Sequence, residues 1–260
     1  MLLTIAVVTY NCEKLLTDTL QSIKTFISNW PGEVEVISID GGSTDNTIEV
    51  IKGSGLFSIM VSEPDDGIFD AMNKACHIST GEWICYMNAG DSFMPGCANE
   101  IYSALNSDDL DSNCAVLYGD TLVYFEDGSE FYKAASSKPS FNNYMPFCHQ
   151  SAFTRRHCVE VFKFDTRYPR VADQKLYLDA LSNDMTFKYC NIPVSRVMAE
   201  GFSNAQIFKT KMEEIEIKVS YGLIPKRHAY IYFSLSIMSH LLKKISPNWL
   251  VAAKRRYWGV

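Results

Sequence analysis

Four short apolar segments, each of the length of one β-strand, dominate the first third of the chain. They cover residues 2–8, 34–39, 58–62 and 83–87. Between the first two, apolar residues recur at helical spacing over residues 16–27. Strands that alternate with helices form βαβ units, in which the strands are parallel and helices cover both faces of the sheet. The sequence therefore predicts an α/β domain with a Rossmann-like, mostly parallel central sheet.

Polar or acidic side chains follow each of these apolar segments. They are Thr9 and Asn11 after the first, Asp40 after the second, Glu63 and Asp65 after the third, and Asn88 and Asp91 after the fourth. In open parallel sheets the carboxyl ends of the strands meet at one edge, and ligands bind just outside that edge. We therefore expect a ligand pocket built from these four loops.

The rest of the chain has a weaker pattern. We expect strands at 115–118 and 122–125, a hairpin into 130–133, a loop at 134–144, a helix at 173–181, an irregular segment at 198–208, and helices over most of the remainder. Within the irregular segment, the loop "AEGFSN" (199–204) carries a glycine and is a candidate lid.

The composition excludes several classes of protein. An apolar content of 47% with 13% aromatic residues supports a large core and argues against disorder. The eight cysteines include no CxxC pair in a chain of 260 residues, which favours reduced thiols over a disulfide scaffold. The start "MLLTIAVVTYN" has neither a basic leader nor a small-residue cleavage site. We therefore expect a cytoplasmic protein.

Charge separates an acidic body from a basic tail. Residues 1–208 carry 14 Lys and Arg against 27 Asp and Glu, whereas residues 209–260 carry 10 against 3. An acidic body is not typical of a nucleic-acid-binding protein. The tail includes the mostly apolar stretch 229–242, which is short for a membrane span and has basic residues on both sides. We expect residues 226–258 to lie on an anionic membrane surface; packing on the domain or a homodimer contact is the alternative.

Six motifs carry a resemblance to a known family. They are "VVTYN", "IDGGSTDNT", "SEPDDGIFDAMNKA" and "GEWICYMNAGD", followed by "CHQSAFTRR" and "VADQKLYLDAL". In this order they resemble family 2 glycosyltransferases of the GT-A fold, closest to small soluble bacterial transferases that build capsule, exopolysaccharide or O-antigen repeat units. The resemblance spans residues 2–205. It implies a transferase domain at 1–208, with a nucleotide-binding half (1–91) and an acceptor half (92–208), before the helical tail at 209–260.

The resemblance assigns most of the donor site to the first half. It implies that Asp40 accepts a hydrogen bond from the nucleotide base beside Thr9 and Asn11, while Tyr10 stacks on the ring. In the family a second aspartate commonly follows the first, and here that residue is Gly41. The further donor contacts that the resemblance implies are Glu63 and Asp65 near the nucleoside, and Asn73 and Lys74 near the diphosphate. The structural alternatives are that Asp40 caps the following helix and that Lys74 is a solvent-exposed helix lysine without a ligand contact.

The tetrapeptide Asn88-Ala89-Gly90-Asp91 stands where the family has its DxD-type motif, which holds a divalent cation on the donor diphosphate. Gly90 occupies a position where a carboxylate is common, so Asp91 is the carboxylate left to bind Mn²⁺ or Mg²⁺. A glycine also lets a phosphate approach the backbone closely. The structural alternative is a turn aspartate that caps the following segment.

The resemblance places the acceptor chemistry in the second half. Asp173 matches an aspartate that begins a helix, where the ionised carboxylate is favoured and can take the proton of the acceptor hydroxyl. A plain N-terminal helix aspartate is the alternative. His149, with Gln150 beside it, matches a segment next to the donor sugar or acceptor. A zinc site from Cys148, His149, His157 and Cys158 is disfavoured because no further ligand motif supports it.

These expectations combine into one function. We expect an inverting, metal-dependent hexosyltransferase that moves a sugar from a nucleotide-diphospho-sugar, with UDP favoured, to a glycan acceptor linked to a lipid diphosphate. One alternative is a nucleotidyltransferase, although "TYNCEKLL" lacks the glycine-rich basic signature of that class. The other is a nucleotide- or glycan-binding protein without turnover, which Gly90 favours.

Overall fold

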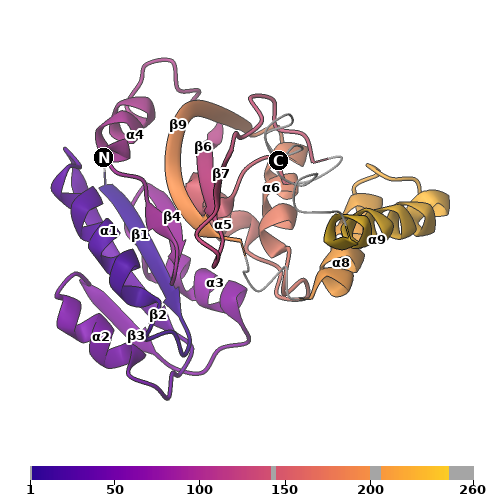
Figure 1. Ribbon diagram of the computed structural model, residues 1–260. Helices are drawn as coiled ribbons and strands as arrows, with labels where there is room; N and C mark the ends of the chain where they lie inside the picture. The colour runs from indigo at the N-terminus through magenta and orange to yellow at the C-terminus, as the bar shows by residue number, and fades with distance from the viewer. Residues whose placement is uncertain (1, 142–144, 200–205, 246–260) are drawn as a thin grey trace.

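The computed structural model describes residues 2–141, 145–199 and 206–245 (Figure 1). Its strands are β1 (Leu2–Thr9), β2 (Glu33–Asp40), β3 (Ile59–Ser62), β4 (Trp83–Asn88), β5 (Ser92–Phe93), β6 (Cys114–Tyr124), β7 (Glu130–Lys133), β8 (Ala152–Arg155) and β9 (Thr186–Met198). Its α-helices are α1 (Leu16–Ser28), α2 (Thr47–Ser54), α3 (Ile68–Ile78), α4 (Cys97–Leu105), α5 (Arg156–Phe162), α6 (Ala172–Ser182), α8 (Ile207–Ser220) and α9 (Ala229–Ile245). Two 3₁₀ turns are η1 (His149–Ser151) and η2 (Lys226–His228).

The described strands form one mixed sheet. Its order is β3-β2-β1-β4-β8-β6-β9-β5, and β7 pairs with β6 outside this path. The first four strands are mutually parallel, as the sequence predicts, and β6 is parallel to β9. Strand β8 is antiparallel to both of its neighbours, β4 and β6, and therefore joins the two parallel parts. The expected α/β fold with helices on both faces is confirmed.

The register of the parallel strands brings their carboxyl ends together. Thr9 of β1 lies opposite Asp40 of β2, which in turn lies opposite Ser62 of β3. On the other side of β1, Val8 lies opposite Asn88 of β4. Since side chains alternate between the faces of a strand and the strands are in step, polar groups at these ends share one edge of the sheet.

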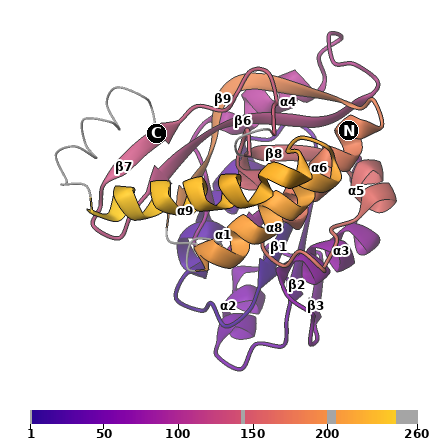
Figure 2. The ribbon, with the colours of Figure 1, turned by 90° about the vertical axis from the view of Figure 1, so that its right-hand side faces the viewer.

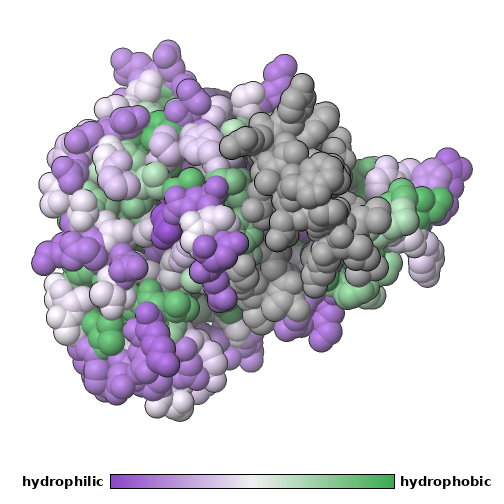
Figure 3. Space-filling model, viewed as in Figure 1, coloured by the Kyte–Doolittle hydropathy of each residue, from purple (hydrophilic) through white to green (hydrophobic). Residues whose placement is uncertain are grey.

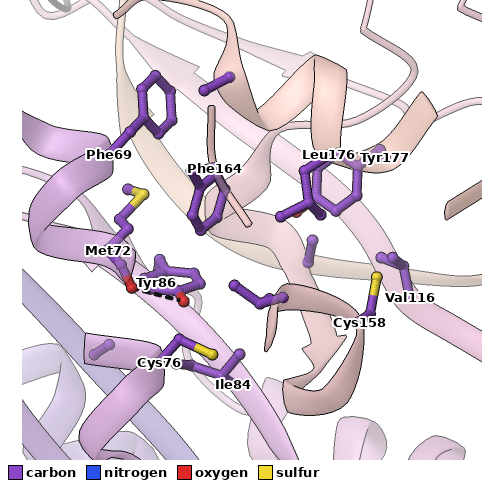
Figure 4. Close-up of a cluster of buried hydrophobic side chains, with 14 of the residues drawn as sticks. Phe69, Met72, Cys76, Ile84, Tyr86, Val116, Cys158, Phe164, Leu176 and Tyr177 are labelled. Atoms are coloured by element: carbon purple, nitrogen blue, oxygen red, sulfur yellow. Dashed lines mark hydrogen bonds between the residues drawn. The ribbon is translucent and has the colours of Figure 1, made fainter. Parts of the chain in front are cut away.

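Alternation along the central strands creates two cores. Leu3, Ile5 and Val7 of β1 belong to a cluster under α1 and α4, whereas Ala6 and Val8 face a second cluster under α3, α5 and α6. Figure 4 shows part of the second cluster, in which side chains of α3 and β4 pack against those of α5 and α6. Phe69 and Phe164 stack there at 5.4 Å between ring centroids. The first 91 residues and the segment after them therefore both contribute to this second core.

Three expectations about the later strands are wrong in detail. The two strands expected at 115–118 and 122–125 form one strand, β6. The polar residues between them, Asp120 and Thr121, are buried and hydrogen-bonded, so the strand continues through them. Asp120 accepts a hydrogen bond from the hydroxyl of Tyr189, and the hydroxyls of Thr121 and Ser151 share another. Strands β8 and β9 lie where helices were expected. The 13-residue β9 contains Pro193 and alternates weakly, and it is held by pairing with β6 along most of its length.

The other elements agree with the pattern of the sequence. The hairpin into β7 and the helix α6 form as predicted. Residues 134–141 have no helix or strand, and 207–208 begin α8 rather than continuing an irregular segment. Most of the lid expected at 199–204 lies outside the described residues.

Helices α8 and α9 form a unit at the side of the molecule opposite α1 and α2 (Figure 1). In Figure 2, α9 runs along the outside of this unit, and Figure 3 shows apolar side chains exposed on it. Among residues 229–238 of α9, whose side chains the structure describes, the exposed apolar ones are Tyr230, Ile231, Tyr232, Leu235 and Met238. Within the described part of the chain, no helix has the length and apolar character needed to cross a membrane.

Candidate functional site

Asp40 is fully buried at the end of β2, and both of its carboxylate oxygens are occupied. Oδ2 accepts hydrogen bonds from the backbone N–H groups of Gly42 (3.0 Å) and Ser43 (2.8 Å) and from the Ser62 hydroxyl (2.8 Å). Oδ1 accepts from the hydroxyls of Thr9 (3.1 Å) and Ser43. Burial raises the pKa of Asp40, but these hydrogen bonds outweigh it and hold the pKa below its ordinary value.

These contacts give Asp40 and Thr9 a structural role. A carboxylate offers about four lone-pair sites, and five donors surround this one, so Asp40 shapes the loop after β2, with Thr9 as one of its supports. The base contact that the resemblance implies for Asp40 stays a prediction. Asn11 also supports the loop after β2, because its Oδ1 accepts a hydrogen bond from the backbone N–H of Thr44 at 2.8 Å. Tyr10, by contrast, is 64% exposed at the rim and is free to stack on a ring.

The loop after β3 engages the residues expected near the diphosphate. The ammonium of Lys74 lies 2.9 Å from Glu63 Oε1 and 3.3 Å from Asp70 Oδ2, and it donates to the carbonyl of Pro64. Hydrogen bonding to Glu63 raises the pKa of Lys74 above its ordinary value. Lys74 and Glu63 therefore brace this loop as an ion pair, and the donor contacts expected of them stay predictions.

Asn73 clamps two distant segments together. Its Nδ2 donates to the carbonyl of Phe164 at 2.8 Å, and its Oδ1 accepts from the N–H of the same residue at 2.9 Å. Both ends of the amide are used, which gives Asn73 a structural role; the diphosphate contact expected of it stays a prediction. Asp65 differs from these residues: Oδ1 accepts from Gly67 N at 2.8 Å, while Oδ2 lies over Gly41.

At the end of β4, side chains from three elements meet. Asn88 Nδ2 lies 3.2 Å from His149 Nε2 on η1, and His149 Nδ1 lies 3.5 Å from Asp173 Oδ2. Asp173 stands in the first turn of α6, and its Oδ1 accepts from Gln174 N at 2.8 Å. The side chains of His149 and Asp173 are 20% and 17% exposed, so a ligand can reach both. The structure thus brings together three residues that the sequence predicts for the site.

Asp91 is 5% exposed, and it ties the turn after β4 to two distant segments. Its Oδ2 accepts from Gln150 Nε2 at 2.8 Å and its Oδ1 from Met198 N at 3.1 Å. Burial raises the pKa of Asp91 to about 6. The turn is further held at Gly90, whose φ of 94° is readily adopted only by glycine, and whose carbonyl accepts from Tyr124 at 2.7 Å.

The residues after β4 fit a cation that takes most of its ligands from a substrate. Asn88 Oδ1 is buried and has no hydrogen-bond donor within the described part of the chain, and Asp91 keeps lone pairs beyond the two that are used. Mg²⁺ is commonly held by one or two protein ligands, with water and phosphate oxygens as the others. Among residues 2–141, 145–199 and 206–245, no three His, Cys, Asp or Glu side chains are grouped as metal ligands.

Some residues of the site were not assigned from the sequence. Gln150 donates a hydrogen bond to Asp91. In the sequence, only its position beside His149 pointed to a place for Gln150 in the site. Gly41 was noted as a departure from the family, yet only the structure shows which side chain lies over it. Arg155 pairs with Glu82 and Arg156 with Glu160. Arg155 lies opposite Trp83 at the start of β4, at the other end of that strand from Asn88.

The chain is similar in sequence to known glycosyltransferases. The family model described as glycosyl transferase family 2 matches residues 4–162. A PGL/p-HBAD biosynthesis glycosyltransferase of Mycobacterium bovis (strain BCG / Pasteur 1173P2) is 25% identical over 202 residues, which are 74% of this chain and 76% of that protein. The same holds for the protein of that name from Mycobacterium tuberculosis (strain ATCC 25177 / H37Ra).

Solved structures share the fold at lower identity. S. aureus TarS 1-349 in complex with UDP-GlcNAc matches with a TM-score of 0.62 and 14% identity, covering 91% of this chain and 72% of that one. The mannosyltransferase PcManGT from Pyrobaculum calidifontis, in complex with GDP-Man and Mn²⁺, matches with a TM-score of 0.60 and 15% identity, covering 98% and 81%. The family match extends over more than half of the chain and the structures share its GT-A fold, so this chain belongs to glycosyl transferase family 2, the nucleotide-sugar-dependent transferases.

Proposed function

We propose that this chain is an inverting hexosyltransferase that moves a sugar from a UDP-sugar to a hydroxyl group of a glycan acceptor. The observation that carries the proposal is the array of Asn88, His149 and Asp173 at the carboxyl edge of the sheet. A carboxylate at a helix N-terminus, beside an imidazole and partly open to solvent, suits a general base that works in its ionised form.

The proposed reaction uses this placement. The oxygen of the acceptor hydroxyl forms a bond to the anomeric carbon of the sugar, while the bond from that carbon to the diphosphate oxygen breaks. The hydroxyl proton passes to the carboxylate of Asp173. His149, 3.5 Å from Asp173 Oδ2, holds the carboxylate in place from the side of β4. A single displacement of this kind inverts the configuration at the anomeric carbon.

Mn²⁺ or Mg²⁺ bound at the end of β4 would neutralise charge on the departing nucleoside diphosphate. The residues of this chain that would hold it are Asp91, through its carboxylate, and Asn88, through the buried Oδ1. Gly90 leaves this turn without a second carboxylate, and Ala89 adds no ligand. We therefore expect metal binding to depend strongly on the nucleotide diphosphate.

The test compares Asp173→Asn with the wild type on a panel of UDP- and GDP-sugars and prenyl-diphosphate-linked monosaccharides. Products are identified by mass spectrometry and their anomeric configuration by NMR. Removal of a general base lowers kcat by about 10²–10⁴-fold, and UDP affinity should stay within about twofold. Asp66→Asn, an exposed aspartate outside the array, is the matched control. An Asp173→Asn variant that keeps more than a tenth of the wild-type kcat contradicts the proposal.

A protein that binds the donor without turnover is the second candidate. The observation that favours it is the turn after β4, in which Gly90 replaces a carboxylate and Asp91 is buried. The panel described above separates the two functions. Tight UDP binding in the absence of any donor consumption, with every acceptor offered, would favour the binding protein.

For the acceptor, we propose a glycan linked to a lipid diphosphate at the cytoplasmic face of a membrane, as an intermediate of surface polysaccharide biosynthesis. Support comes from the exposed apolar face of α9, where Ile231, Leu235 and Met238 follow one another at helical spacing, and from exposed Lys226 and Arg227 just before it. The remainder of the segment expected at the membrane, 246–258, lies outside the described residues.

Co-sedimentation with phosphatidylglycerol vesicles tests this contact. The wild type should sediment with phosphatidylglycerol vesicles and not with phosphatidylcholine vesicles. A variant in which both Ile231 and Leu235 are replaced by Glu should no longer sediment with either. Glu49→Gln, on α2 at the far side of the molecule, is the control. A protein that ignores both vesicle types and forms a dimer that the double variant dissociates would assign this face to a homodimer instead.

A further inference from the structure

We propose that the ammonium group of Lys133, at the end of β7, binds a phosphate group of the acceptor and so anchors the acceptor beside His149 and Asp173. This inference rests on the proposed function, in which the acceptor glycan is linked to a lipid diphosphate. It gives a binding role to a strand that the sequence predicts only as part of a hairpin.

The first step is the direction in which Lys133 points. In the pairing of β6 with β7, Lys133 lies opposite Thr121. Directly opposed residues of antiparallel strands project their side chains to the same face of the sheet. The hydroxyl of Thr121 shares a hydrogen bond with that of Ser151 in η1, so this face is the one that carries η1. Accordingly, Lys133 Nζ lies 3.6 Å from Sγ of Cys148, the residue directly before His149.

The second step is the charge that Lys133 brings to this place. Its side chain is half-buried, and it forms no ion pair with any carboxylate in residues 2–141, 145–199 and 206–245. A thiol is a weak hydrogen-bond acceptor, so the contact with Cys148 leaves donors of the ammonium group for a ligand. Lysines on a strand edge commonly serve only to prevent pairing with another strand. Such a lysine gains nothing from burial, whereas a lysine that binds an anion does.

The third step is the state of the other cations near this edge of the sheet, which are already paired. Residues 1–208 carry 14 Lys and Arg against 27 Asp and Glu, so the body as a whole repels an anionic substrate. A substrate phosphate therefore needs a cation that no carboxylate neutralises. Among the described residues, the neutralised pairs are Lys74 with Glu63 (2.9 Å), Lys175 with Asp179 (2.8 Å) and Arg196 with Glu130 (2.7 Å).

The fourth step decides between a phosphate of the acceptor and one of the donor. In a single displacement, the acceptor oxygen approaches the anomeric carbon from the side opposite to the departing diphosphate. The departing diphosphate belongs at the end of β4, next to Asn88 and Asp91. Strands β8 and β6 separate β4 from β7 in the sheet, and η1, which carries His149, packs against both β4 and β6. Lys133 therefore reaches η1 from the side away from β4, which is the side of the acceptor.

Binding of a prenyl diphosphate tests the inference without any sugar transfer. The probe is geranyl diphosphate, titrated by calorimetry into the protein with UDP and Mn²⁺ already filling the donor site. Lys133→Met should lower the affinity for this probe by about 10- to 100-fold, which is the range for a hydrogen bond to a charged group. Lys133→Arg keeps the charge and should retain most of the affinity. Lys52→Met, an exposed lysine of α2, is the matched control and should bind as the wild type does.

Turnover gives a second measurement, which a merely structural role of Lys133 would not produce. The two acceptors are a prenyl-diphosphate-linked monosaccharide and an alkyl glycoside of the same monosaccharide, which has no phosphate. For Lys133→Met, the KM of the diphosphate-linked acceptor should rise by about 10- to 100-fold while kcat stays within about threefold. The KM of the alkyl glycoside and the affinity for UDP should stay within about twofold of the wild type.

The outcomes separate this inference from the proposed function. A wild type that does not bind geranyl diphosphate, or a Lys133→Met variant that binds it equally well, overturns the inference, while UDP binding and the Asp173→Asn result still decide the proposed function. A Lys133→Met variant that loses affinity for UDP alone assigns the cation to the donor and overturns the acceptor assignment. If the wild type binds no UDP with or without Mn²⁺, the proposed function fails. Should Lys133→Met not fold, as judged by circular dichroism, Lys133→Gln takes its place.

Discussion

Replacing Asp40 by asparagine separates a structural role of this carboxylate from a binding role. The substitution keeps the size of the side chain, but it removes the charge and turns one acceptor oxygen into an NH₂ donor. In the best orientation, the remaining oxygen keeps the backbone N–H groups of Gly42 and Ser43. The amide NH₂ then faces the hydroxyls of Thr9 and Ser43, which must rotate in order to accept.

The expected magnitude follows from these bonds. A hydrogen bond to a charged acceptor contributes about 1.5–3 kcal/mol, and one to a neutral acceptor about 0.5–1.5 kcal/mol. Two backbone bonds therefore lose about 1 kcal/mol each, and the rearranged hydroxyls add a smaller cost. We expect Asp40→Asn to lower the free energy of unfolding by about 2–3 kcal/mol. Asp66→Asn, on the exposed surface nearby, should change it by less than about 0.5 kcal/mol.

Urea denaturation, followed by tryptophan fluorescence, measures this difference in the free energy of unfolding. An unchanged m value shows that the folded and unfolded states of the variant are comparable with those of the wild type. The pH dependence gives a second reading. Asp40 has a folded-state pKa below its ordinary value of 3.8, so its contribution is fully present above that value and is lost as the pH falls through the folded-state pKa. The gap between wild type and Asp40→Asn should narrow on acidification below pH 3.8. Equal stability of the two proteins at neutral pH would refute the structural role.

Three further substitutions test local packing and hydrogen bonding in the fold. Gly81→Ala should cost about 1–3 kcal/mol in thermal unfolding, because its Cβ would lie 2.6 Å from the backbone nitrogen of Thr4. Gly53→Ala, inside α2, should instead stabilise the folded protein by about 0.5–1 kcal/mol, because no atom lies within 4 Å of the added Cβ. A Gly53→Ala variant that is less stable than the wild type would contradict this reasoning. Asn73→Ala should cost about 1–3 kcal/mol through the two lost bonds to Phe164, while UDP affinity changes by less than about threefold. A large loss of UDP affinity with unchanged stability would instead support the diphosphate contact expected of Asn73.

Much of the fold is readable from local patterns. The four strands of the first 91 residues and the helices α1, α3 and α6 follow apolar periodicity that each segment carries by itself. In the array around Asp173, the same pattern predicts only the place of Asn88, which ends a parallel strand. His149 and Asp173 stand on η1 and α6, and the family resemblance, not strand-end geometry, pointed to them. Strand β9 is different: its alternation is weak, and it exists because β6 pairs with it from 114 to 124. A strand that depends on its neighbour leaves little trace in its own residues.

The chemical role of a polar residue is less local still. Asn73, Lys74 and Asp40 all stand in motifs that resemble donor-binding segments, and each is taken up by partners within the protein. Asn73 binds a residue 91 positions away, and Asp40 binds one 22 and another 31 positions away. Asp65 is left with a free oxygen because the residue facing it, in another loop, is a glycine.

The sequence by itself determined the class of fold, the edge of the sheet that carries the site and the family, because strand length, helical spacing and ordered motifs are properties of short segments. Only the tertiary structure decided which polar groups at that edge remain available to a ligand. A carboxylate or amide can bind a ligand only with the lone pairs and protons that the folded chain has not already used. To know which of these remain, one must know every neighbour of the side chain in space.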